Sequence, residues 1–161
     1  MELKIPNTVM SQIDVARLIR ELNNLEDFFT SVATRQSGTP MTPPRLSRTL
    51  DSLARSNKFN LLDKNQRGEL NNKLDQVLKS APLLHISFAS EPSPQVMERI
   101  LVWLRINIHP QTLVQVGLQP TIAAGCVLRT PNKIFDLSLR TRLKQQEPYL
   151  VTLIAGAAHG H

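Results

Sequence analysis

Residues 112–143 read TLVQVGLQPTIAAGCVLRTPNKIFDLSLRTRL. The apolar runs at 112–116, 126–129 and 133–137 have the length and β-branched content of strands. Pro131 fixes φ in the short connection 130–132, so the last two runs are predicted to form a β-hairpin. Residues 117–125 form an irregular exit from the first run, and a helix is expected from about Ser138. This stretch therefore predicts strands followed by a hairpin and a terminal helix.

The residues just before this stretch extend the same pattern towards the N-terminus. Residues 83–88 predict another strand. Ser93 as cap and Pro94 at the first helical position then predict a helix over 94–108. The spacing changes from helical to extended at Ala81 and Pro82, which we interpret as a domain boundary. The sequence thus predicts a small α/β domain over 81–154, followed by a flexible tail at 155–161.

The first part of the chain has helical spacing. Residues 8–35 predict a long amphipathic helix whose apolar stripe consists of Leu18, Leu22, Leu25, Phe29 and Val32. Such a stripe needs a covering surface. Packing within the chain is the default explanation, and binding in the groove of a partner is the alternative.

Two further helices are predicted before the boundary. Gly38 and three prolines interrupt the first helix. Thr42 as cap and Pro43 at the first position predict a second helix ending near Asn57. Asp63 with Gln66 resembles a capping box that begins a third helix. We therefore expect an α+β fold, with a three- to four-helix region at 1–80 and the α/β domain after it.

Composition limits the function further. Apolar residues make up 41% and charged residues 20% of the 161 residues, which is a globular balance. The single cysteine, no visible secretory signal and no long apolar run predict a cytoplasmic protein without a membrane-spanning segment. The net charge of +6 is divided equally between the two halves, and aromatic residues are only 4%, so no nucleic-acid binding is predicted.

The sequence contains no recognisable catalytic constellation. Phosphate-binding loops, dinucleotide motifs and metal-ligating histidine clusters are all missing, so no cofactor, metal or small-molecule substrate is predicted. Cys126 is interpreted as a buried structural thiol and Trp103 as a core or domain-packing residue, with partner anchoring as the alternative for Trp103. Asp136 is interpreted as a helix cap or arginine partner. The residues therefore predict a chain without a catalytic centre of its own.

Only one segment concentrates charge. Arg129, Lys133, Arg140, Arg142 and Lys144 accompany a single acid, Asp136, between positions 129 and 144. A solvated helical face and a surface that docks onto an acidic partner helix explain this segment equally well.

The motifs in residues 114–143 resemble the C-terminal signature of the delta subunit of rotary ATP synthases, whose mitochondrial counterpart is the oligomycin-sensitivity-conferring protein. The matching positions are a turn proline, a glycine, a strand-end arginine, an Asp-x-Ser pair and the start of a helix: Pro120, Gly125, Arg129, Asp136, Ser138, Arg140, Arg142 and Leu143. Gly125 would allow a backbone geometry or a close approach that a larger residue prevents. Asp136 or Ser138 can accept hydrogen bonds from amides where strand becomes helix.

This resemblance implies a stator subunit in the peripheral stalk of a proton-translocating ATP synthase. The helical part would hold the alpha subunits of the catalytic head, and the C-terminal domain would bind the b subunit. Members of the family usually carry six helices in the first part, whereas three or four are predicted here. A regulatory or adaptor protein with a delta-like C-terminal fold, bound to a different partner helix, is therefore the alternative.

Overall fold

The computed structural model describes residues 3–34, 42, 44–122, 124–130, 132–139, 144, 146–149 and 151. It confirms an α+β fold with an N-terminal helical region and C-terminal strands. The chain divides into two compact units, of which the first contains Met1–Pro82 and Glu98–Val114 and the second contains Leu83–Met97 and Gln115–His161. The sequence predicted a single domain boundary after residue 80. In the structure the chain leaves the first unit after Pro82 and returns to it from Glu98 to Val114.

Helix α1 spans Gln12–Thr34 and begins later than the predicted residue 8. Ser11 and Asp14 explain this start, because Asp14 Oδ2 accepts from the Ser11 N–H at 3.0 Å and Ser11 Oγ accepts from the Asp14 N–H at 3.3 Å. This reciprocal capping box satisfies amide donors that the first turn of a helix leaves free.

Helix α2 spans Arg48–Ser56, so the predicted start at Thr42 and Pro43 is wrong. Ser47 is the N-cap, and its Oγ accepts from the Leu50 N–H at 3.1 Å. The Ser47 hydroxyl also donates to Glu21 Oε2 at 2.8 Å, and its N–H donates to the same carboxylate. Glu21 belongs to α1, so a contact across 26 positions fixes where α2 begins. Asn57 follows the last turn as the C-cap, close to the predicted end.

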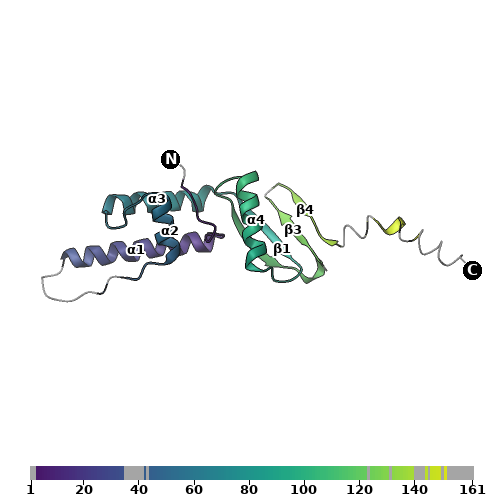
Figure 1. The fold of residues 1–161 in the computed structure, drawn as a ribbon, viewed down its shortest axis with the longest axis horizontal. Helices are drawn as coiled ribbons and strands as arrows, with labels where there is room; N and C mark the ends of the chain where they lie inside the picture. Colours follow the sequence, from purple (N-terminus) through teal and green to yellow (C-terminus); the bar gives the residue numbers. More distant parts are fainter. Residues whose placement is uncertain are drawn as a thin grey trace, which may run out of the picture. The chain divides into compact units, whose positions relative to one another are not determined.

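Helix α3 spans Lys64–Ser80 and starts where the sequence predicted. Asp63 Oδ1 accepts from the N–H groups of Asn65 and Gln66 at 2.8 and 3.3 Å. Gln66 Oε1 accepts from the Asn60 N–H at 2.7 Å. In a full capping box the Gln66 side chain would instead accept from the Asp63 N–H. Helices α1 and α3 lie side by side (Figure 1) and bury their apolar faces in one core. Its aliphatic residues include Val15, Leu18, Leu22, Leu25, Leu70, Leu74 and Val77.

Residues 3–10 are held in the first unit by Arg105, which lies in helix α4, Pro94–Asn107. The buried guanidinium donates to the carbonyl oxygens of Ile5, Pro6 and Val9 at 3.1, 3.1 and 2.6 Å. The Val114 N–H donates to the Met10 carbonyl at 2.8 Å and extends this attachment. Burial lowers the pKa of Arg105 from its usual range.

Four strands form a mixed sheet in the order β2-β1-β3-β4. The strands are β1 (Leu83–Phe88), β2 (Leu113–Leu118), β3 (Cys126–Arg129) and β4 (Ile134–Asp136). Helix α4 connects β1 to β2, which suits parallel neighbours, whereas β3 is antiparallel to both β1 and β4. The predicted hairpin is therefore confirmed as β3–β4 (Figure 1).

Strand β2 runs further than predicted. Gly117 and Leu118 belong to it, although the sequence placed them in the irregular exit. A Cβ at Gly117 would lie 3.6 Å from Ser87 Oγ, and the Gln119 N–H donates to the Phe88 carbonyl at 2.8 Å. Pairing along the strand outweighs the weak strand propensity of glycine. The 3₁₀ turn Pro120–Ile122 follows.

Candidate partner-binding site

Two segments of backbone cross closely at the junction where β3 begins and β4 ends. Gly125 has φ +92°, a conformation that residues with a side chain rarely adopt. A Cβ at this position would lie only 2.5 Å from the Leu137 carbonyl oxygen and 3.0 Å from the Ser138 Cα. Only glycine fits this crossing of two backbones without a shift of one of them.

Hydrogen bonds fix the same crossing from both sides. The Leu137 N–H donates to the Cys126 carbonyl at 2.9 Å, and the Leu139 N–H donates to the Ala124 carbonyl at 2.8 Å. Asp136 Oδ1 accepts from the Ser138 N–H at 2.9 Å, and Ser138 is buried. The carboxylate therefore turns the chain after β4 at the point where it approaches Gly125. These are the roles that the sequence analysis suggested for Gly125 and Asp136.

The other predicted residues of this region have different positions. Pro120 opens the 3₁₀ turn before β3, and Arg129 is exposed at the end of β3, opposite both His85 and Ile134. Lys144 is exposed in a helical conformation. The predicted residues Arg140, Arg142 and Leu143 lie outside the described part of the chain.

The hairpin and the residues that follow it expose apolar side chains. Ile134 is 66% exposed and Phe135 is 46% exposed, although they point to opposite faces of β4. Leu137 and Leu139 are also exposed. Sequence reasoning missed this surface because a strand with apolar residues on both faces normally indicates burial on both faces.

The apolar stripe of α1 does not form such a surface. Leu18, Leu22 and Leu25 are buried in the core of the first unit. Phe29 is half-buried, and the Arg67 guanidinium lies 4.4 Å from the centre of its ring. Of the five predicted residues only Val32 is exposed. Packing within the chain therefore occupies most of this stripe.

Trp103 and Cys126 were also assigned roles from the sequence. Trp103 is 57% exposed, so it does not belong to the core, which was one of the two roles predicted for it. The buried side of α4 is instead supplied by Leu101 and Leu104. Cys126 is half-buried, and this burial raises the pKa of its thiol, which suits an unreactive residue.

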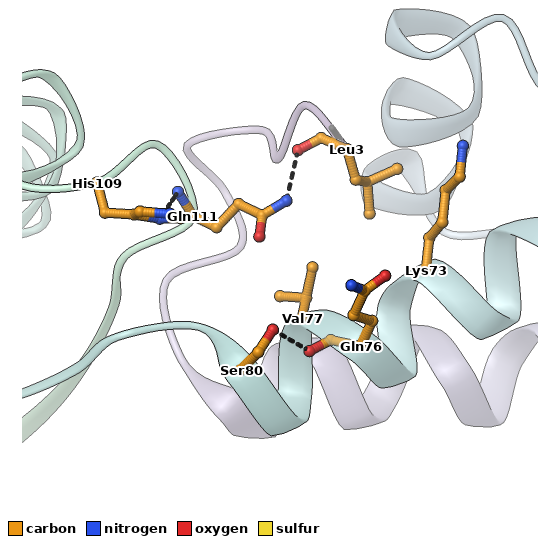
Figure 2. Close-up of a pocket in the computed structure, with 7 residues that line it drawn as sticks. All are labelled: Leu3, Lys73, Gln76, Val77, Ser80, His109 and Gln111. Carbon is orange, nitrogen blue, oxygen red and sulfur yellow. Dashed lines mark hydrogen bonds between the residues drawn. The ribbon is translucent and has the colours of Figure 1, made fainter. Parts of the chain in front are cut away.

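The first unit contains a polar pocket of about 540 Å³, shown in Figure 2. Its walls include side chains from α3 and from the loop before β2: Lys73, Gln76, Val77, Ser80, His109 and Gln111. Ser80 Oγ donates to the Gln76 carbonyl at 2.7 Å, and Gln111 Nε2 donates to the Leu3 carbonyl at 3.3 Å. These bonds hold the wall together. Within the described residues, no three His, Cys, Asp or Glu side chains gather as metal ligands, and no helix could span a membrane.

Comparison with known proteins adds no identification. No family model matches the sequence, and no curated protein matches it either. The hairpin junction and the exposed apolar residues beside it therefore define the candidate site.

Proposed function

We propose that the protein is a non-catalytic stator subunit of a rotary proton-translocating ATP synthase, and that it links the catalytic head to the b subunit of the peripheral stalk. The observation that carries this proposal is the junction of β3 and β4. Gly125, Asp136 and Ser138 are the positions where the sequence resembles the delta family, and the fold gives each of them a distinct structural role. A motif whose residues are needed to build one junction supports a shared local fold.

The hairpin beside this junction is the surface we assign to the b subunit. Ile134, Phe135 and Leu137 expose apolar area at the edge of the sheet, and Arg129 and Lys133 add positive charge. An amphipathic helix with acidic borders complements both properties. The cations Arg140, Arg142 and Lys144 continue the charge along the sequence.

The helical unit would dock onto the alpha subunits of the head, and the protein would be peripheral to the membrane through the assembled complex. In this role the chain resists torque and takes part in ATP synthesis without a chemical step of its own. A self-contained core of α1, α2 and α3 suits a mechanical link, because its apolar residues are packed within the unit.

A regulatory or adaptor role is the second candidate, and the size of the helical region favours it. The described residues before β1 contain three helices, whereas members of the resembling family usually have six. An adaptor would keep the hairpin surface and bind a helix that is not part of a stalk.

A pull-down of the tagged full chain from native membranes in mild detergent tests the choice. Mass spectrometry should identify alpha, beta and b subunits if the stator proposal is correct. Other proteins without synthase subunits would support the adaptor role instead. Reversal of charge at Arg140 and Arg142 should reduce recovery of b, whereas the matched double reversal at the exposed Arg17 and Arg20 of α1 should not.

A further inference from the structure

A groove in the first unit is lined only by apolar and cationic side chains among the described residues. Its volume is about 400 Å³, and its walls come from residues 3–5, from the end of α4 and from the following turn. The lining residues are Leu3, Lys4, Ile5, Arg105, Ile106 and Pro110. The groove is therefore suited to an apolar ligand that also carries negative charge.

Helix α4 extends this surface beyond the groove. Arg99, Trp103 and Ile106 are all exposed and follow each other at spacings of four and three. At 3.6 residues per turn they fall within about 60° of one another, and we call them the α4 stripe. Glu98, the only acid of α4, lies outside this arc, about 80° around the helix from Ile106 and about 140° from Trp103.

The core of the first unit does not explain the α4 stripe. Leu101 and Leu104 supply the buried side of the helix, whereas Ile106 is 78% exposed. An exposed tryptophan and an exposed isoleucine on adjacent turns, beside a groove, are typical of a binding surface. Tryptophan is also among the residues that contribute most to protein interfaces.

The charge at this surface identifies the class of partner. Among the described residues, Arg105 donates to carbonyl oxygens and to Asn7 Oδ1, and none of these acceptors carries a negative charge. Lys4 and Arg99 are exposed at the groove and on the stripe. Acidic side chains on a partner would be attracted to this surface, and basic ones would be repelled.

We propose that this groove and the α4 stripe bind an amphipathic helix of a partner protein, with an apolar face bordered by acidic residues. The apolar face covers Trp103 and Ile106, and the acidic borders approach Lys4 and Arg99. This surface is distinct from the β3–β4 hairpin, and the inference does not depend on the stator proposal.

Trp103 makes the test direct, because it is the only tryptophan in the chain. The full chain is titrated with three synthetic helical peptides of equal length: one with a leucine face and glutamate borders, one with lysine replacing glutamate, and one with serine replacing leucine. The leucine–glutamate peptide should shift Trp103 emission to the blue and protect it from acrylamide quenching. The other two peptides should bind at least ten-fold more weakly.

Variants locate the site. Ile106→Ser should weaken binding of the leucine–glutamate peptide about ten-fold, because a large apolar contact is lost. Leu62→Ser is the matched control, since Leu62 is exposed to a similar degree in the same unit, and it should bind as the unchanged chain does. Lys4→Glu should reverse the preference between the glutamate and lysine peptides.

Three results would overturn the proposal. Equal binding of the glutamate and lysine peptides would show that charge does not select the partner. A blue shift that grows with protein concentration alone would assign the surface to a second copy of the chain. A shift with phosphatidylserine vesicles but not with the leucine–glutamate peptide would assign it to a membrane surface.

Discussion

The helical core of the first unit and the β3–β4 hairpin of the second differ in where their apolar residues lie. In α1, α2 and α3 the leucines that define the pattern are buried, and Leu50, Leu53 and Leu70 have no exposed surface. In the hairpin Ile134, Leu137 and Leu139 are exposed. The helical core is therefore complete within the chain, whereas the hairpin gains apolar burial only from something that covers it.

The largest expected effect is a cavity in the helical core. Leu74 is buried in α3, so Leu74→Ala should lower the free energy of unfolding by about 2–5 kcal/mol. Chemical denaturation of the free chain measures this change. Leu62→Ala, at an exposed position, should change it by no more than about 0.5 kcal/mol. Equal losses for both variants would contradict a packed helical core.

The next effect concerns the junction that supports the hairpin. Gly125→Ala imposes a side chain at φ +92° and against the Leu137 carbonyl, so we expect a loss of about 1–3 kcal/mol. Amide hydrogen exchange at Leu137 and Leu139 should accelerate. Gly117→Ala is the control, because its nearest atom would be 3.6 Å away, and it should leave these amides almost unchanged. Unchanged exchange in Gly125→Ala would argue against the close crossing.

A smaller effect is expected at the ion pair between α1 and α3. Arg67 is buried, and its Nη2 lies 2.6 Å from Glu26 Oε2. Glu26→Gln leaves the guanidinium buried with a weaker acceptor and should cost about 1–2 kcal/mol in thermal unfolding. The exposed pair Asp51–Arg55 is the comparison, because Asp51→Asn should cost less than about 0.5 kcal/mol. A larger loss from Asp51→Asn would reverse the expected order.

The smallest effect on folding should accompany the largest effect on partner binding. Ile134→Ser replaces a side chain that is already exposed, so the free energy of unfolding should change by less than about 1 kcal/mol. Recovery of the b subunit in the pull-down should nevertheless fall. Ile13→Ser on α1, with a similar exposed fraction of 68%, should retain that recovery. Full recovery with Ile134→Ser would remove the hairpin from the proposed interface.

The sequence predicted the features that depend on local pattern. Asp63 was recognised as the cap of α3 because its acceptor bonds reach only two and three residues ahead. The hairpin followed from two apolar runs around a short turn with proline. Gly125 was found through the resemblance, and its φ then supplied the physical reason for the glycine.

The predictions that failed concern features that depend on residues far away in the sequence. Ser47 caps α2 while it bonds to Glu21, and no local signal at Ser47 shows that contact. Trp103 was assigned to the core or to domain packing because it lies in an apolar helix. Only the packing of Leu101 and Leu104 shows which side is buried. Exposure of the hairpin was missed for the same reason, since apolar residues on both faces of a strand do not show whether other elements cover those faces.

The central claim is that a partner completes the hairpin while the helical core is complete without one. Hydrogen exchange measured by mass spectrometry on the tagged chain, free and captured with its partners from native membranes, tests it most directly. We expect the amides of residues 126–139 to exchange more slowly in the captured sample than in the free chain. The core amides of α1 and α3 should exchange slowly even in the free chain. Equal exchange of residues 126–139 in both samples would contradict it.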